Sequence, residues 1–198
     1  VSLIKFIPYG IFRRLHRLFP LVYLVPVFHS VLLPDFAYRL TPLGFSLAAL
    51  MVAGSYAAVV SLLGLIGARR RVKGRIIALE SFPGVRVLRS VVKAGTGWPG
   101  HSAGQFAFVT SDRREGAHPY TIASGWNPAN REIVFVTKAL GDHTARLPQT
   151  LKLDQEVMLE GPYGAFTFED QSPVQIWVGG GVGITPFIAR MQQLAELG

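Results

Sequence analysis

Apolar residues dominate the first third of the chain in a pattern typical of membrane helices. No charged residue occurs from Leu40 to Ala68, and a helix of this length crosses a hydrocarbon layer of about 30 Å. Its many glycine, alanine and serine residues let neighbouring helices approach closely in lipid. Leu18–Leu33 is a shorter apolar run that contains Pro20 and Pro26, and it spans a bilayer only marginally. The pattern predicts two membrane helices joined by a short outer loop at Asp35–Arg39.

After Arg71 the pattern changes to short runs rich in valine, isoleucine, phenylalanine and tyrosine. Turn dipeptides such as Pro83-Gly84 and Asn127-Pro128 separate these runs. Several short strands in close succession favour a small antiparallel barrel. The predicted strands are Val72–Glu80, Val85–Val92, Gln105–Ser111, Tyr120–Ala123, Glu132–Lys138 and Glu156–Glu160.

The last segment reads as a strand, a glycine turn and a helix. Val174–Val178 is a short apolar run, Gly179–Gly183 follows it, and a helix is expected from about Pro186 to Leu197. A parallel nucleotide-binding fold begins in this way. The predicted fold class is therefore mixed. It combines transmembrane helices at 1–71, an antiparallel β-barrel domain at 72–170 and the start of an α/β nucleotide-binding (Rossmann-like) domain at 171–198.

Charge and composition refine this division. Charged residues make up only 16% of the chain, against about a quarter in soluble domains, and the net charge is +8. The basic residues gather beside the apolar runs rather than over a folded face, which favours a membrane boundary over nucleic-acid binding. The positive-inside rule then predicts an integral protein of the inner or plasma membrane, in contact with lipid, whose part after Arg71 is cytoplasmic. The two basic groups are Arg13, Arg14 and Arg17, and Arg69, Arg70, Arg71, Lys73 and Arg75.

Cysteine is absent, so this sequence holds no disulfide, thiolate nucleophile, iron–sulfur ligand or zinc thiolate. The sequence opens on Val1 rather than methionine and closes directly after the predicted helix of the nucleotide-binding unit. We therefore expect a piece of a longer polypeptide, with further transmembrane helices elsewhere in it.

Two motifs carry candidate binding chemistry. Gly179–Pro186 combines a glycine-rich turn with a helix start, which suits the phosphates of a bound nucleotide, although a tight turn needs the same glycines. His118–Ser124 offers a cation, an aromatic plane and a hydroxyl along one extended segment. Those groups suit a phosphate, a flat ring and a ring nitrogen, but a half-buried strand has the same pattern.

The order of five motifs resembles the ferredoxin-reductase-like flavoproteins, and most closely their membrane branch, the ferric reductases and NADPH oxidases. The resemblance covers nearly the whole chain and implies FAD and NAD(P)H as cofactors. The motifs in order are Gly-Gln-Phe at 104–106, His-Pro-Tyr-Thr-Ile-Ala-Ser at 118–124, Leu-Gly-Asp-His-Thr at 140–144, Glu-Gly-Pro-Tyr-Gly at 160–164 and Gly-Gly-Gly-Val-Gly-Ile-Thr-Pro at 179–186.

The resemblance also implies a role for individual residues. His118 stands where the family holds the flavin pyrophosphate, and most soluble relatives have arginine there. Tyr120 would stack beside the isoalloxazine ring, and Thr121, the catalytic candidate, would hydrogen-bond near its reactive N5. The other implied flavin contacts are Pro119 within the same motif, and Gly141, Asp142 and Thr144 at a second phosphate contact. Those implied for the nicotinamide side and the docking of NAD(P)H are Gly161, Pro162 and Gly164, and Gly180, Gly181, Gly183 and Thr185.

His16 and His29 are candidate ligands of haem b iron, because histidine within an apolar helix is costly. At 1.5 Å rise per residue they lie about 20 Å apart along a helix, which suits two haems. They also point about 140° apart on a straight helix, and His16 stands among arginines as an interfacial residue would. The family carries paired histidines at about this spacing, in a context like Leu15–Leu18. The partner ligands from another helix are not in this sequence.

The resemblance implies a membrane flavoprotein that moves electrons from NAD(P)H through FAD, and through haem, to ferric iron or oxygen. Three alternatives remain open from the sequence. The first is a membrane-anchored flavin reductase that feeds a protein or soluble acceptor without haem. The second is a non-enzymatic membrane subunit, and the third is basic binding to a membrane surface without a redox role.

Overall fold

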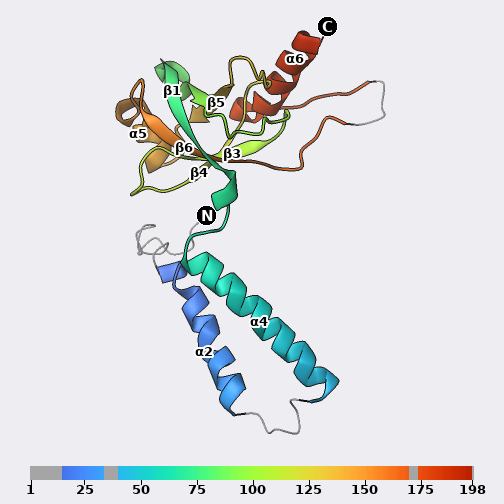
Figure 1. Cartoon of the computed structure of the whole chain (residues 1–198). Coiled ribbons are helices and arrows are strands. Elements are labelled where there is room, and N and C mark those ends of the chain that lie inside the picture. Colours follow the sequence, from blue (N-terminus) through green and yellow to red (C-terminus); the bar gives the residue numbers. More distant parts are fainter. Residues whose placement is uncertain (1–14, 34–39, 170–173, 198) are drawn as a thin grey trace. The chain divides into compact units, whose positions relative to one another are not determined.

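The computed structural model describes residues 15–33, 40–169 and 174–197 (Figure 1). These residues divide into two compact units, Val1–Ala68 and Arg69–Gly198. The predicted outer loop at Asp35–Arg39, the basic pair Arg13 and Arg14, and the predicted domain boundary at 170/171 lie outside the described residues.

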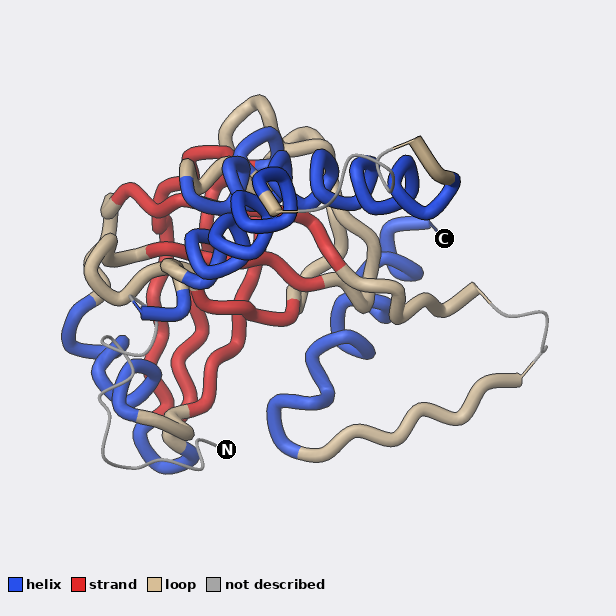
Figure 2. The backbone as a smooth tube through the Cα atoms, turned by 90° about the horizontal axis from the view of Figure 1, so that it is seen from below, coloured by secondary structure: helices blue, strands red, loops and turns tan. Residues whose placement is uncertain are grey.

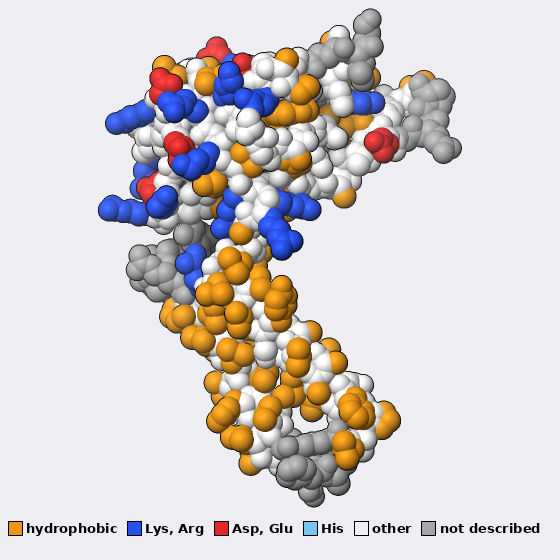
Figure 3. Space-filling model, in the orientation of Figure 1, with side chains coloured by type: hydrophobic (Ala, Val, Ile, Leu, Met, Phe, Trp, Pro, Cys, Tyr) orange, Lys and Arg blue, Asp and Glu red, His pale blue; other side chains and the backbone are white. Residues whose placement is uncertain are grey.

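The first unit contains two packed helices, α2 (Phe19–Leu32) and α4 (Pro42–Leu62). Thr41 caps α4, because its Oγ1 accepts a hydrogen bond from the N–H of Gly44 at 3.2 Å. Figure 3 shows apolar side chains spread over the surfaces of both helices. By length and composition, α4 is the one helix among the described residues able to cross a membrane, and α2 is apolar but only 14 residues long.

The second unit is built on a six-stranded antiparallel sheet, drawn in red in Figure 2. The strands pair in the order β4-β3-β6-β1-β2-β5, so β6, late in the chain, lies between β3 and β1 near the middle. All six predicted strands are present, with ends displaced by up to three residues. The strands are β1 (Arg71–Phe82), β2 (Val87–Ala94), β3 (Phe106–Thr110), β4 (His118–Thr121), β5 (Glu132–Lys138) and β6 (Glu156–Tyr163).

Alternating side chains build the core of this sheet. Along β5, Ile133, Phe135 and Thr137 are buried while their neighbours are partly exposed, which is the period-two pattern of a strand with one face on a core. Leu159 of β6 is fully buried in the same apolar cluster. Burial on this scale contributes about 1.5–3 kcal/mol for each large apolar side chain.

The prediction of a closed barrel is wrong, because the sheet is open. Its two edge strands, β4 and β5, meet through one isolated bridge, Ile122 to Phe135, instead of a continuous ladder. Helix α5 (Asp142–Thr150) lies beside β4, where the hydroxyl of Tyr120 contacts His143.

Two further expectations need correction. No helix was predicted at Asp142–Thr150, a short segment that contains Pro148, but these residues form α5. Val174–Val178 was expected to be a strand, but it has no strand assignment, and Val174, Ile176 and Val178 are at least 77% exposed. A parallel strand needs neighbours for its hydrogen bonds, and none pairs with it among the described residues. The following helix, α6 (Thr185–Leu197), agrees with the prediction to within one residue.

Candidate functional site

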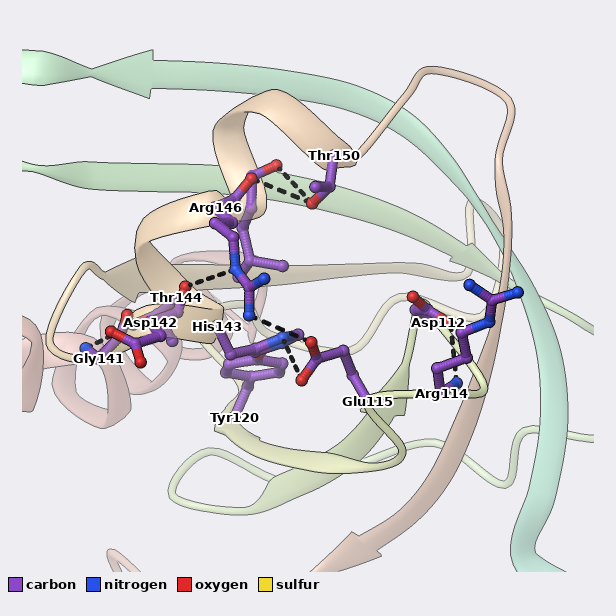
Figure 4. Close-up of polar contacts among 11 residues, drawn as sticks. Asp112, Arg114, Glu115, Tyr120, Gly141, Asp142, His143, Thr144, Arg146 and Thr150 are labelled. Atoms are coloured by element: carbon purple, nitrogen blue, oxygen red, sulfur yellow. Dashed lines mark hydrogen bonds and ion pairs between the residues drawn. The ribbon is translucent and has the colours of Figure 1, made fainter. Parts of the chain in front are cut away.

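The most organised polar cluster of the second unit lies where β4 meets the start of α5. The imidazole rings of His118 and His143 stack with centroids 3.7 Å apart and an angle of 7° between planes. The hydroxyl of Tyr120 lies 3.1 Å from Nε2 of His143. Burial raises the pKa of Tyr120 to about 12, so its phenol keeps its proton at neutral pH. Figure 4 shows Tyr120 and His143 side by side, with α5 above them.

An acidic residue and an arginine complete this cluster. Arg146 Nη2 lies 3.2 Å from Oε1 of Glu115, and Nδ1 of His143 lies 3.8 Å from the other carboxylate oxygen (Figure 4). The pKa of His143 is lowered chiefly because burial disfavours the imidazolium. Glu115 opposes this effect, while Arg146 adds to it. The ring of His143 is therefore neutral at neutral pH, although charged side chains lie around it.

Glu115, His118 and His143 also bring three potential metal ligands within 4.8 Å of one another. Ring nitrogens coordinate a metal along lone pairs in the plane of the ring. Two nearly parallel rings at 3.7 Å direct those lone pairs side by side rather than toward one ion. This arrangement suits an anion placed against the imidazole N–H groups better than a metal ion.

The second predicted phosphate contact lies at the N-terminus of α5, beside the same histidine pair. Oγ1 of Thr144 accepts hydrogen bonds from the N–H groups of Leu140 and Gly141 at 3.0 and 3.1 Å, and donates to the carbonyl of Gly141. The Thr144 hydroxyl therefore shapes the turn. A Cβ on Gly141 would meet nothing within 4 Å, so the turn is open to a ligand. The carboxylate of Asp142 is exposed at the helix start, and its repulsion of an anion leaves the backbone N–H groups as the suitable donors.

The sheet brings the catalytic candidate together with the Glu-Gly-Pro-Tyr-Gly motif. Phe106 of β3 pairs with Thr121 on one side and with Tyr163 on the other, so both motifs reach the same end of the sheet. Thr121 is exposed there, as is Pro119 two residues earlier. The other members of the motif, Gly161, Pro162 and Gly164, surround Tyr163, whose ring lies beneath the guanidinium of Arg70 at 5.0 Å.

The predicted nucleotide turn forms a short 3-10 helix, Gly181–Ile184, that leads into α6. Cβ atoms placed on Gly180, Gly181 and Gly183 would meet nothing within 4 Å, so the space above this turn is open. Thr185 was expected to contact NAD(P)H, but its side chain is buried. It is 2% exposed, and its hydroxyl donates to the carbonyl of Val182 at 2.9 Å, so it stabilises the turn from below.

In the first unit, the structure places His16 and His29 differently. His16 lines an open cavity of about 420 Å³ between α2 and α4, with Tyr23 and Gly54 among its neighbours. His29 lies near the other end of α2, is exposed, and does not line this cavity. The two histidines are therefore not brought together, which is consistent with two separate sites.

Comparisons with known proteins bear on this arrangement. Residues 85–167 match the model of a protein family described as an FAD-binding domain. Residues 85–167 therefore resemble an FAD-binding domain. This domain contains the histidine pair, Thr121, the start of α5 and the Glu-Gly-Pro-Tyr-Gly motif, whereas the glycine turn lies beyond it.

Two curated relatives resemble part of this chain. Ferric reduction oxidase 5 of Arabidopsis thaliana is 37% identical over 93 residues, which are 45% of this chain and 13% of that protein. The reductase component of propane 2-monooxygenase from Mycolicibacterium goodii is 31% identical over 70 residues, 34% of this chain and 20% of that protein. The chain thus spans a small part of the length of these relatives.

Solved structures agree on the fold. An Amycolatopsis cytochrome P450 reductase matches with a TM-score of 0.54 and 18% identity, over 64% of this chain and 39% of that one. The FAD/NAD-binding domain of a Vibrio cholerae nitric oxide dioxygenase matches with a TM-score of 0.52 and 23% identity, over 64% of this chain and 57% of that one. At such identities the likeness concerns the fold alone.

The structure adds two site residues that the sequence analysis did not assign, His143 and Glu115. His143 stands inside the Leu-Gly-Asp-His-Thr motif, so its position was available from the sequence. Its stacking on His118 was not, because it depends on how α5 packs beside β4.

Proposed function

We propose that this chain is the flavin-carrying part of a membrane-anchored oxidoreductase that transfers electrons from NAD(P)H to an acceptor. The observation that carries the proposal is the FAD-binding domain, with its motif residues gathered on β4, α5 and the end of β6. Bound FAD supplies hydride acceptance and one-electron release, and the protein supplies position and electrostatics.

The residues of the domain suit two parts of FAD, the diphosphate and the isoalloxazine ring. The His118–His143 pair and the N-terminus of α5 offer positive charge and N–H groups to the diphosphate. Tyr120 provides an aromatic plane, and its protonated hydroxyl is held by His143. Thr121 presents an exposed hydroxyl for a ring nitrogen, at the end of β4 that lies beside the Gly161–Gly164 turn. We assign this turn to the nicotinamide side, and the open glycine turn at Gly180–Gly183 to the phosphates of NAD(P)H.

The proposal also covers the membrane helices and the terminal electron acceptor. The apolar surfaces of α2 and α4 support anchoring in lipid, with the FAD-binding domain on the cytoplasmic side. His16, which lines its cavity, and His29 would each hold the iron of one b haem, together with histidines from further transmembrane helices. Ferric iron or oxygen is the proposed terminal acceptor, and the likeness to a ferric reduction oxidase favours ferric iron.

A membrane-anchored flavin reductase without haem is the second candidate. The exposure of His29 among the described residues favours it. The two candidates differ in their response to His29→Ala in the membrane-embedded protein. Loss of a bis-histidine haem spectrum with retained flavin reduction supports haem transfer, whereas unchanged electron transfer to every acceptor supports the haem-free reductase.

The flavin half is tested by purifying the chain with excess FAD and following flavin reduction by NADH and NADPH in a stopped-flow instrument. Thr121→Val keeps the shape of the side chain and removes the hydroxyl, so we expect flavin reduction to slow by about a hundredfold with FAD still bound. Thr121→Ser is the matched control and should restore most of the rate. A chain that never retains FAD refutes the proposal and leaves a non-enzymatic membrane subunit.

A further inference from the structure

The feature that neither the motifs nor the family match explains is the partnership of His143 with His118. Two imidazole rings, one from β4 and one from the first turn of α5, lie parallel at 3.7 Å. His143 is only 17% exposed, and it touches both His118 and Tyr120. It therefore links the residue assigned to the diphosphate with the residue assigned to the flavin ring.

The hydrogen bonds determine how the neutral ring of His143 is protonated. Nδ1 of His143 faces the carboxylate of Glu115 at 3.8 Å, which favours the neutral tautomer with its proton on Nδ1. Nε2 of that tautomer accepts from the Tyr120 hydroxyl, which keeps its phenolic proton and lies 3.1 Å away. A second proton on Nε2 requires the Tyr120 hydroxyl to turn its own proton away, so the charge of His143 and the direction of the Tyr120 hydroxyl change together.

The groups around the pair have opposing effects on the pKa of His143. Glu115 and Asp112, on the loop before β4, favour a proton on His143, while burial and Arg146 on α5 oppose it. Two parallel imidazolium rings at this distance would repel strongly, because like charges within a few ångström disfavour the charged form. At neutral pH the empty site therefore holds fewer protons than its two rings can accept.

A diphosphate placed against this pair changes the balance, because its negative charge favours the protonated rings. The adjoining cavity, of about 570 Å³, adds the cations Arg113, Arg114 and Arg146 at its walls, next to Asp112 and Glu115. The arginines are charged at any pH, so only the histidine pair makes the site responsive to pH near neutrality.

We propose that His143 is a positioning residue of the FAD site, and that the His118–His143 pair takes up a proton when it binds the flavin diphosphate. This inference rests on the proposed function. FAD affinity then falls as pH rises, because the proton taken up on binding becomes scarcer. For one proton the dissociation constant rises by up to about tenfold per pH unit, over the interval between the pKa of the empty pair and that of the occupied pair.

The test compares FAD with riboflavin, which has the same ring and no phosphate. The full chain, stripped of flavin, is titrated with each compound between about pH 5.5 and 8.5 at constant ionic strength, with flavin fluorescence as the readout. We expect the FAD dissociation constant to rise with pH and that of riboflavin to stay nearly constant. Parallel pH dependence for the two compounds, or none for FAD, overturns the inference.

Four variants separate the roles of the two rings. His143→Gln should weaken FAD binding by about tenfold and reduce its pH dependence, while His143→Phe keeps an aromatic plane and should recover part of the affinity. His118→Arg supplies a permanent cation, so FAD binding should persist with a flatter pH profile. Arg89→Gln is the control, because Arg89 lies on β2 and pairs with Glu80 at 3.9 Å. Wild-type affinity and slope in His143→Gln overturn the inference.

A second readout follows the protons directly. The chain has only five histidines, so nitrogen NMR of the labelled imidazoles resolves His118 and His143 with the aid of the variants. We expect FAD to raise the pKa of one of the two rings and riboflavin to leave both unchanged. Bound FAD with no change in either pKa overturns the inference alone, whereas a chain that binds neither flavin at any pH overturns the proposed function with it.

Discussion

We predict that a buried histidine outside the proposed flavin site makes the second unit less stable in acid. His101 is 8% exposed and lies between the rings of Trp98 and Trp126, at centroid distances of 6.4 and 5.3 Å. Its Nε2–H donates to the carbonyl of Ser124 at 3.1 Å, which holds the turn after β4. Burial lowers the pKa of His101 from 6.5 to about 4, so the folded chain keeps this ring neutral.

The size of the effect follows from linkage between proton binding and folding. Between pH 6.5 and about 4 the unfolded chain protonates His101 and the folded chain does not, so the free energy of unfolding falls as the pH falls. A difference of about 2.5 in pKa corresponds to about 3 kcal/mol, at about 1.4 kcal/mol for each pKa unit. This stability is fully present above pH 6.5 and is lost by about pH 4. For a unit of this size it lowers the melting temperature by roughly 10 °C.

The assay is urea unfolding of the wild type and His101→Asn at pH 7 and pH 4, followed by tryptophan fluorescence. The asparagine keeps an N–H donor for Ser124 and does not titrate. It should cost about 1–2 kcal/mol at pH 7 through lost packing. Other groups titrate equally in both proteins, so the wild type should lose about 3 kcal/mol more than the variant between the two pH values. Equal losses would refute the assignment of a buried neutral imidazole.

Two further predictions concern the backbone near the flavin site. Gly104 has φ +93°, and a Cβ there would overlap the carbonyl oxygen of Phe166. Gly104→Ala should therefore lower the free energy of unfolding, measured by urea titration, by about 2–3 kcal/mol. Gly84→Ala is the control and should be nearly neutral, because a Cβ on Gly84 meets nothing within 4 Å. Thr144→Val removes a hydroxyl that binds two backbone N–H groups at the start of α5, and it should destabilise that turn by about 1 kcal/mol and weaken FAD binding several-fold in fluorescence titrations. Thr144→Ser should behave as the wild type, and equal FAD affinity in the valine variant would contradict the role given to this turn.

The sequence predicted most of the secondary structure of the second unit for local reasons. β5 was predicted with its observed ends, because Glu132–Lys138 is rich in β-branched and aromatic residues and turns lie on both sides. The helix after the glycine turn was found because Pro186 suits a first helical turn. α5 was missed, since Pro148 and the polar residues of Asp142–Thr150 resemble a loop. The strand predicted at Val174–Val178 was wrong, although the segment has the apolar residues of a buried strand. Among the described residues no strand pairs with it.

The sequence alone determined the order of the motifs, the resemblance that they carry and the residue types available to the proposed flavin, because each of these depends on a few neighbouring positions. Only the tertiary structure decided that the sheet stays open, that β6 lies between β3 and β1, and that Thr121 reaches the same end as Tyr163. It also decided that His143 stacks on His118. These features arise from contacts between distant segments, which form where strand pairing and burial of the core are jointly most favourable, and no local pattern specifies them.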